Sequence, residues 1–380
     1  MHILISPNAF KNSIDAAAAA KAIEEGLQQS RLNCITTCFP VGDGGDGTGQ
    51  LLTEILKGVT ITENVHDPLG SIIRASFGLI DKGQTAVIEM AAASGIRLLK
   101  KEELDPLHAS SYGTGELIKK ALELGVKKII LCVGGSATVD GGCGIAEALG
   151  IRFLDADRKI LKAKPENLLH LSDIDMTELD KRVPATEFII LADVINPLLG
   201  EKGAARIFGP QKGASVAEVE QLEKTLSLFN KIQMKKTGID LSAIKYGGAA
   251  GGTAAGLRAL LLARLVNGID YFLAITGFDN ALQKADLLIT GEGSIDLQTL
   301  EGKAPFGVAE RAKKKNIPVI GLAGKLPEHA PAELTVYFDE LININQEGTD
   351  MNAALLLTKE NLIRTSLALG NRLAHTYNSF

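Results

Sequence analysis

The feature that most constrains the fold is an alternation of short apolar strands and amphipathic helices at both ends of the chain. Residues 2–7 (HILISP) form a β-branched run that ends at a proline, and residues 34–41 (CITTCFPV) form a second such run. Apolar residues at helical spacing follow each run. The rhythm returns after residue 286, where we expect a helix at 304–314, strands at 318–324 and 334–339, and a helix at 351–375. Strands that alternate with helices predict a parallel, doubly wound sheet with helices on its faces.

The middle of the chain has a different pattern. Residues 61–93 alternate between apolar and polar side chains, with turn signals at Gly70 and Gly83, which is typical of an antiparallel meander. Further α/β units follow, with expected helices at 114–124, 143–149, 216–236 and 256–265 and expected strands at 128–133 and 187–192. We therefore predict two different α/β domains. Residues 1–60 and 285–380 would form one discontinuous domain, and residues 61–284 an inserted mixed α/β domain.

Composition limits the classes of function. The formal net charge is -5, only 4% of the residues are aromatic, and no basic run exceeds Lys313–Lys315, which argues against a nucleic-acid interface. The four cysteines lack a C-x-x-C pair and the six histidines lack H-E-x-x-H spacing, which argues against a zinc site. The first apolar run is too short for a signal peptide, and no apolar run of about 18 residues follows. We therefore expect a cytoplasmic protein that binds no membrane.

Five loops that carry glycine and charged side chains each follow an expected strand. They span residues 6–13, 41–49, 133–144, 192–214 and 290–303. In doubly wound folds such loops gather at the carboxyl edge of the sheet, where ligands bind. Glycines let a ligand approach backbone N–H groups, and this property combined with cations and carboxylates suits phosphoryl transfer. We expect the active site in the cleft between the two domains.

Several of these residues also have structural explanations, which the sequence leaves open. Asp43 or Asp46 can cap the helix that follows, and Lys11 can be a solvated side chain. Asp193 fits a structural role in a turn as well as it fits a catalytic role. Arg206 can be the partner of a buried salt bridge.

Short motifs alone do not assign the nucleotide. Gly42, Gly44 and Gly47 satisfy G-x-G-x-x-G, but they follow the second expected strand, and two acids lie inside the loop. A Walker A loop is absent, because neither Gly302-Lys303 nor Gly324-Lys325 is followed by Ser or Thr. The residues favour phosphoryl transfer through a less common fold. A dinucleotide-dependent oxidoreductase and a non-catalytic sensor of a small hydroxy acid stay open as alternatives.

Seven longer motifs carry a family resemblance. They read SPNAFKNSIDA, VGDGGDGT, EMAAASGI, SSYGTGELI, GGSATVDGGCG, NPLLGEKGAARIFGPQKGA and ITGEGSIDLQTLEGK. In this order they resemble the bacterial glycerate kinases of the two-domain type, from about residue 3 to beyond residue 325. The resemblance implies a flavodoxin-like parallel domain with a second α/β domain, and phosphorylation of D-glycerate by ATP with Mg²⁺. It favours a glycerate 2-kinase, which makes 2-phospho-D-glycerate and ADP, with a kinase of a related small hydroxy acid as the alternative.

Two motifs depart from the pattern of this family. The family often has Asp where this chain has Asn8, and Glu where this chain has Asp46. The first change removes a charge, and the second shortens the reach of the carboxylate. Both leave the predicted kinase activity in place. They weaken the inference that the metal ligands of the family lie at the matching positions of this chain.

We assign roles by residue type and by position in the loops. The expected catalytic residues are Asp193, as the base that accepts the proton of the glycerate hydroxyl, together with Lys11 and Asp43. We expect substrate binding from Arg206, Asp46 and Lys212, nucleotide binding from Gly134, Gly135, Ser136, Thr138, Asp140 and Lys303, and Mg²⁺ binding from Glu292 and Asp296. The expected partners are D-glycerate and ATP, with a homodimer left open.

Overall fold

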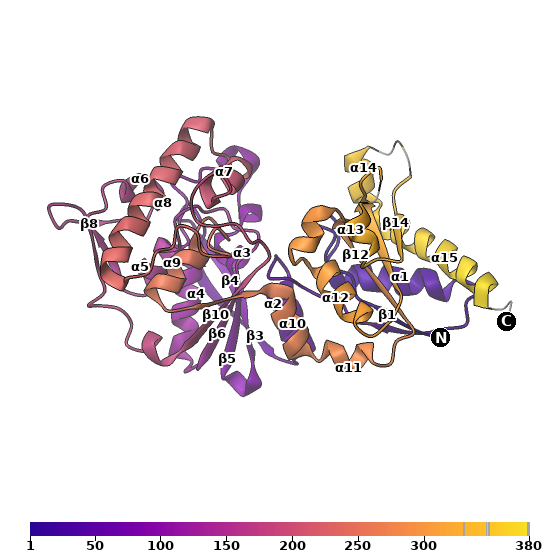
Figure 1. Ribbon diagram of the computed structural model, residues 1–380. Helices are drawn as coiled ribbons and strands as arrows, with labels where there is room; N and C mark the ends of the chain where they lie inside the picture. The colour runs from indigo at the N-terminus through magenta and orange to yellow at the C-terminus, as the bar shows by residue number, and fades with distance from the viewer. Residues whose placement is uncertain (330, 347, 349, 378–380) are drawn as a thin grey trace. The chain divides into compact units, whose positions relative to one another are not determined.

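The computed structural model of the protein describes residues 1–329, 331–346, 348 and 350–377, which divide into two compact units (Figure 1). Unit 1 comprises Met1–Asp43 and the chain from Ile269 onward, and unit 2 comprises Gly44–Gly268. Both divisions come earlier in the chain than the expected boundaries after residues 60 and 284. Helix packing explains the difference, because the helix after residue 47 covers strands of unit 2 and the helices before residue 284 belong to unit 1. That each unit folds as a separate domain stays a prediction.

Unit 1 contains a five-stranded parallel sheet. Across the sheet its strands are β14 (Glu340–Asn343), β13 (Val319–Lys325), β12 (Leu287–Ser294), β1 (His2–Ile5) and β2 (Ile35–Cys38). Counted along unit 1 alone, this is the strand order 5-4-3-1-2, which is the order of flavodoxin-like folds. The structure confirms the predicted parallel, doubly wound sheet.

One strand of this sheet lies later in the chain than expected. The run at 334–339 is predicted as a strand, but it starts inside a short helix that spans Ala332–Thr335, and β14 begins only at Glu340. The carboxylate of Asp339 accepts a hydrogen bond from the N–H of Val319 at 2.7 Å. This contact fixes the chain beside β13 at the point where β14 begins.

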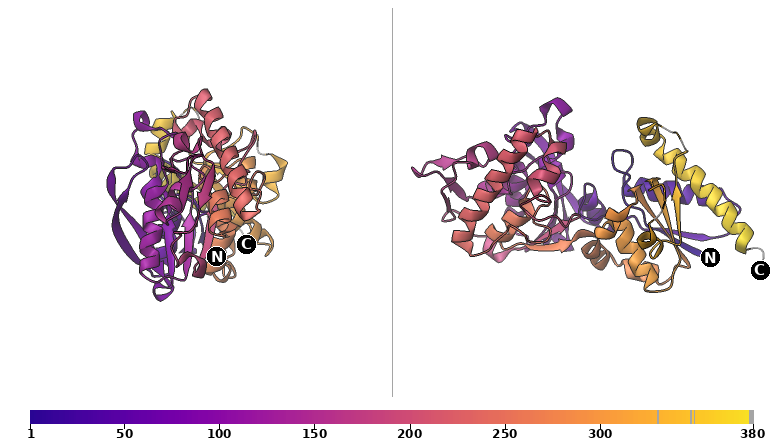
Figure 2. Two further views of the ribbon diagram at one scale, coloured as in Figure 1. Left: turned by 90° about the vertical axis from the view of Figure 1, so that its left-hand side faces the viewer. Right: turned by 45° about the horizontal axis from the view of Figure 1, so that its top comes forward.

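The helices of unit 1 bury both faces of the sheet. They are α1 (Ala16–Gln28), α10 (Gly268–Thr276), α11 (Phe278–Leu282), α12 (Ala304–Lys313), α13 (Ala332–Thr335), α14 (Met351–Leu356) and α15 (Thr358–Tyr377). α1 and α15 lie side by side (Figures 1 and 2) and share one core with Ile3 and Ile5. Because successive strand residues point to opposite faces, the fully buried Leu4 faces away from that core. α12 contacts β12 and β13.

Unit 2 contains a six-stranded sheet with mixed strand directions. Across the sheet its strands are β11 (Arg264–Asn267), β10 (Glu187–Ala192), β6 (Lys128–Cys132), β5 (Thr85–Glu89), β4 (Ile72–Ile80) and β3 (Val59–His66). β3, β4 and β5 form the antiparallel meander predicted for residues 61–93, and β5, β6, β10 and β11 are parallel. These strands confirm the predicted mixed α/β architecture. The helix expected at 256–265 is shorter than predicted, because the chain after Leu260 turns into β11.

Eight helices are described in unit 2, most of them short. They are α2 (Thr48–Ile55), α3 (Met90–Ser94), α4 (Tyr112–Glu123), α5 (Cys143–Ala148), α6 (Pro165–Leu168), α7 (Ala204–Phe208), α8 (Val216–Thr237) and α9 (Thr253–Leu260). The 3₁₀ turns are η1 (Asp81–Gly83), η2 (Ile96–Leu98), η3 (Lys101–Glu103), η4 (Val183–Ala185), η5 (Pro210–Lys212) and, in unit 1, η6 (Leu297–Glu301). α2 packs against β4 and β5. α8 begins at a capping box, in which the carboxylate of Glu218 accepts the N–H of Ser215 at 2.7 Å.

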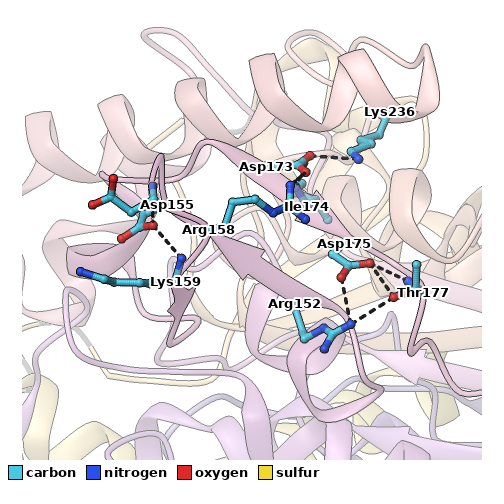
Figure 3. A network of polar contacts seen from close by, with 10 residues as sticks. Arg152, Asp155, Arg158, Lys159, Asp173, Ile174, Asp175, Thr177 and Lys236 are labelled. Atoms are coloured by element: carbon cyan, nitrogen blue, oxygen red, sulfur yellow. Dashed lines mark hydrogen bonds and ion pairs between the residues drawn. The ribbon is translucent and has the colours of Figure 1, made fainter.

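A small antiparallel sheet extends unit 2. It consists of β8 (Ile160–Leu161), β7 (Arg152–Leu154) and β9 (Asp173–Asp175). Figure 3 shows its charged contacts, among which the ion pairs Arg152–Asp175 and Lys236–Asp173 both measure 2.9 Å. These pairs are partly exposed, so each contributes little to stability. The fully buried Phe153 and Ile174 therefore do more to hold the small sheet to unit 2.

Two further features concern the cysteines and the helices. The four cysteines are free thiols. Across the described ranges, no helix has both the length and the apolar character that crossing a lipid bilayer requires.

The core of unit 2 predicts the effect of shortening one of its side chains. Phe229 in α8 is 1% exposed and belongs to the same core as Leu222 and Leu226. We expect Phe229→Ala to lower the free energy of unfolding by about 3–5 kcal/mol, because the substitution leaves a cavity that its neighbours fill only in part. Urea denaturation followed by circular dichroism measures this change. Val216→Ala in the same helix is the control, because Val216 is 86% exposed, and equal effects of the two substitutions would contradict the core described for unit 2.

Candidate functional site

In unit 1 the predicted loops meet where the strand order changes direction. β1 lies between β2, its successor in the chain, and β12. The loop that leaves β1 runs along β12, since the N–H groups of Ser6 and Asn8 donate to the carbonyl oxygens of Ile289 and Gly291 at 2.7 and 2.8 Å. In doubly wound folds the ligand binds at such a switch point, beside the carboxyl ends of the strands. The sheet therefore places Lys11, in the loop after β1, and Glu292, near the carboxyl end of β12, at this edge; the loop expected from residue 290 begins only after Ser294.

Asp43 is a buried acid at the first turn of α12. Its Oδ2 accepts hydrogen bonds from Nδ2 of Asn8 at 3.0 Å and from the N–H of Ala304 at 3.4 Å. The positive end of the helix dipole favours a carboxylate at this position. Asn8, one of the two departures in the motifs, gives Asp43 a hydrogen-bond donor, whereas a second carboxylate would repel it. Asp43 does not cap the helix that follows it, because the N-cap of α2 is Gly47.

Glu292 is a second buried acid at the same place. Its Oε1 accepts a hydrogen bond from Oγ1 of Thr299 at 3.4 Å. Burial and the charge of Asp43 raise the pKa of Glu292 to about 7, and the charges of Lys303 and Lys11 oppose this shift. Unit 1 thus brings together four predicted site residues, two acids and two lysines, that act on one another electrostatically.

Asp296 has a different environment. Its Oδ1 accepts the N–H of Gln298 at 2.8 Å and so caps η6, and its Oδ2 accepts the hydroxyl of Ser294 at 3.3 Å. These contacts explain Asp296 as a capping residue. Its predicted role as a metal ligand stays a prediction.

The acids of unit 1 suit a magnesium ion whose other ligands are phosphate and water. They are less suited to a metal site formed by protein side chains alone. Within the part of the chain that the structure describes, no three His, Cys, Asp or Glu side chains are arranged to hold a metal. Mg²⁺ is often bound through one or two carboxylates, with phosphate oxygens and water as the other ligands. A cation beside Glu292 and Asp43 would relieve the repulsion that raises the pKa of Glu292.

In unit 2 two glycine loops contact each other through their backbones. The N–H of Gly134 donates to the carbonyl oxygen of Gly44 at 2.9 Å. A Cβ atom at residue 134 would lie 2.5 Å from the Cα of Gly45, so only glycine fits there. Asp46 continues the first loop and forms an ion pair with Arg97 at 2.8 Å. The loop predicted to bind phosphate and the loop with the predicted substrate acid therefore form one surface beside β6.

Lys212 supports the second of these loops from inside the protein. Its ammonium group is buried and donates to Oγ of Ser136 at 2.8 Å and to the carbonyl oxygen of Thr138 at 2.7 Å. Burial lowers the pKa of Lys212 to about 7, and the carboxylate of Asp140 opposes this shift. These contacts explain Lys212 as a support for the loop, and its predicted contact with substrate stays a prediction.

Asp140 is fully enclosed and bonds to the protein. Its carboxylate accepts hydrogen bonds from the N–H and the hydroxyl of Ser111 at 2.8 and 2.7 Å, and from the N–H groups of Gly142 and Gly144 at 3.0 and 3.2 Å. Burial raises the pKa of Asp140, and these hydrogen bonds oppose the shift. Asp140 thereby joins the starts of α4 and α5, while its role toward a nucleotide stays a prediction.

Arg206 and Asp193 lie on the long loop and short helix after β10. Both terminal nitrogens of Arg206 donate to the two carboxylate oxygens of Glu220 in α8, which is the salt bridge that the sequence left open. The pair is partly exposed rather than buried. Asp193 follows the last residue of β10 directly and is partly buried. A substrate contact through the terminal nitrogens of Arg206 would compete with its pair with Glu220.

Sequence reasoning missed three residues that shape these loops. Ser111 binds Asp140, Arg97 binds Asp46, and the carboxylate of Glu89 at the end of β5 accepts the N–H of Gly49 at 2.7 Å. Glu89 is the first residue of the motif EMAAASGI and Arg97 follows its last residue, so a charged residue at each end of the motif was the available signal. The partner of each of them lies far away in the sequence.

Comparison with known proteins identifies the family. A sequence model of the glycerate kinase family matches residues 3–374. Among curated relatives, a glycerate kinase from Bacillus subtilis is 41% identical over 378 residues, which cover 99% of both chains. A glycerate 2-kinase from Escherichia coli is 39% identical over 374 residues, which cover 98% of both chains.

A solved structure is similar over the whole chain. It is a crystal structure of a protein assigned as glycerate kinase 2 from Salmonella typhimurium LT2, with 38% sequence identity and a TM-score of 0.83. The match covers 100% of this chain and 99% of the other. The similarity thus includes both α/β units and the motifs from which the kinase was predicted. The chain therefore belongs to the glycerate kinase family of enzymes.

Proposed function

We propose that the enzyme transfers the terminal phosphoryl group of ATP to the 2-hydroxyl of D-glycerate, giving 2-phospho-D-glycerate and ADP, and that it acts in the cytoplasm. Membership of the glycerate kinase family supports the substrate, and the relative named glycerate 2-kinase supports the 2-hydroxyl. The observation that carries the proposal is the group of two acids and two lysines in unit 1. Glu292 and Asp43 suit a Mg²⁺-bound phosphate, and Lys303 and Lys11 supply positive charge beside them.

The residues of unit 1 would act on the charge of the phosphoryl group. Glu292 and Asp296 would be ligands of Mg²⁺, which would neutralise part of the negative charge on the phosphate oxygens. Lys11 and Lys303 would stabilise the negative charge on the transferring group. Asp43 holds the start of α12 through the N–H of Ala304, and so orients the helix that Lys303 caps.

The residues of unit 2 would bind the reactants and accept a proton. In loop 134–138 the N–H of the exposed Gly135 suits a phosphate oxygen, whereas the N–H groups of Gly134 and Ala137 already donate to the carbonyl oxygens of Gly44 and Ser94. Asp46 would contact the glycerate hydroxyls, and Asp193 would accept the proton of the hydroxyl that is phosphorylated. That the two units serve one active site stays a prediction, as does a homodimer.

An assay with several hydroxy acids tests the reaction. We expect ADP release from Mg-ATP with D-glycerate at a higher kcat/KM than with glycolate or L-lactate, and ³¹P NMR should identify the product as 2-phosphoglycerate. A 3-phosphoglycerate signal would contradict the 2-hydroxyl as acceptor. Thermal stabilisation by NAD(H) but not by ATP would favour the oxidoreductase alternative.

Substitution of Asp193 tests the proton acceptor. We expect Asp193→Asn to lower kcat by about 10²–10⁴-fold, because an amide cannot accept the proton, while the affinity for ATP is preserved. Steady-state kinetics and calorimetric titration with ATP measure the two quantities. Asp157→Asn, at an exposed acid of unit 2, is the control and should leave kcat unchanged. A loss of only a few-fold at Asp193 would assign the base to another residue.

Substitution of Glu292 tests the metal ligand. We expect Glu292→Gln to raise the Mg²⁺ concentration for half-maximal activity at constant ATP by about tenfold, which corresponds to about 1.4 kcal/mol of metal affinity. Glu301→Gln in the neighbouring turn η6 removes an exposed charge and serves as the control. If both variants have the same Mg²⁺ requirement as the original enzyme, Glu292 is not a ligand.

A further inference from the structure

Glu89 is an acid at the end of β5 that reaches the start of α2. Its Oε1 accepts the N–H of Gly49 at 2.7 Å, in the first turn of the helix. Gly49 has no side chain, and a Cβ atom there would lie 2.6 Å from the Cγ of Glu89. The two positions are therefore matched, because the glutamate occupies the space that a larger residue 49 would need.

The chain segment that follows Glu89 makes further contacts with both glycine loops. Arg97 binds Asp46 at 2.8 Å. The N–H of Ile96 donates to the carbonyl oxygen of Gly135 at 2.9 Å, and the carbonyl oxygen of Ser94 accepts the N–H of Ala137 at 2.9 Å. Segment 89–97 thus holds loop 44–49 at two points and loop 134–137 at two others.

The electrostatic surroundings of Glu89 agree with a contact to the loop backbone. Burial raises the pKa of Glu89 to about 7, the N–H groups of Gly49, Gln50 and Gly47 oppose this shift, and the charge of Asp46 adds to it. Asp46 in turn forms a partly exposed ion pair with Arg97. Burying a carboxylate costs free energy unless it is hydrogen-bonded, and Glu89 lies beside several N–H donors of the loop. An apolar side chain at this position would not require such donors.

We propose that Glu89 is a positioning residue for the kinase reaction: its side chain fixes loop 44–49, and so sets the place of Asp46 relative to the phosphate-binding loop 134–138. This inference rests on the proposed function, in which Asp46 contacts the glycerate hydroxyls. Glu89 acts through the loop and does not touch the substrate itself. Its loss should therefore weaken glycerate binding more than ATP binding.

Three variants separate this role from a general effect on stability. Glu89→Leu keeps the approximate size of the side chain but removes the acceptor, and it should raise KM for D-glycerate about tenfold, equivalent to about 1.4 kcal/mol, with KM for ATP changed less than about twofold. Glu89→Gln keeps an oxygen that accepts the N–H of Gly49, so it should restore most of the lost affinity. Gly49→Ala keeps the carboxylate but displaces it, and it should reproduce the effect of Glu89→Leu. Glu54→Gln, at an exposed position of the same helix, is the control and should leave both KM values unchanged.

Hydrogen exchange supplies a readout that does not depend on activity. In Glu89→Leu, the amides of residues 44–50 should exchange at least about tenfold faster, while amides of β6 and β10 keep their protection. If the original enzyme fails to phosphorylate glycerate, the proposed function is wrong, but the exchange measurement still decides the role of Glu89. Unchanged exchange in the loop, or equal increases of KM for glycerate and ATP in a folded Glu89→Leu variant, would overturn the inference.

Discussion

The close backbone contact between the two glycine loops of unit 2 is the constraint on which the candidate site depends. At this contact the N–H of Gly134 meets the carbonyl oxygen of Gly44, and there is no space for a side chain at residue 134. The polar side chains around it bond to the protein: Lys212 holds Ser136 and Thr138, and Asp140 holds the starts of two helices. The loop thus presents main-chain groups on a rigid support, which suits the recognition of an anion by geometry as well as by charge.

Unit 1 solves a different electrostatic problem. It gathers two buried acids, Asp43 and Glu292, and burial raises the pKa of Glu292. Asn8 and the N–H of Ala304 donate hydrogen bonds to Asp43, while the charges of Lys303 and Lys11 oppose the burial that raises the pKa of Glu292 to about 7. Such a site favours a ligand that brings both a cation and phosphate oxygens.

The sequence predicts the type of each sheet well, because strand and helix periodicity depend on neighbouring residues. It predicts less well which sheet a helix covers: α2 has the expected apolar face, yet it packs on β4 and β5 of unit 2, which moves the division of the chain to Asp43. Among the site residues, Asp43 lies in the predicted loop after β2, whereas Glu292 lies inside β12, at the carboxyl end of the strand. The partner of Arg206, Glu220, and the contact between Glu89 and Gly49 escaped prediction, because each joins residues whose proximity is created only by tertiary packing.

The strand order of unit 1 has a consequence for synthesis on the ribosome. β1 pairs through Ile3 with Leu287 of β12, whereas all strands of unit 2 lie between residues 59 and 267. At about 5–20 residues per second, roughly 15–55 s pass between the synthesis of Ile3 and that of its partner in β12. During this time the apolar strand HILI has only β2 as a neighbour, and one of its edges stays open to other chains. Nascent unit 1 is therefore the part of this enzyme with the greatest need for protection from aggregation.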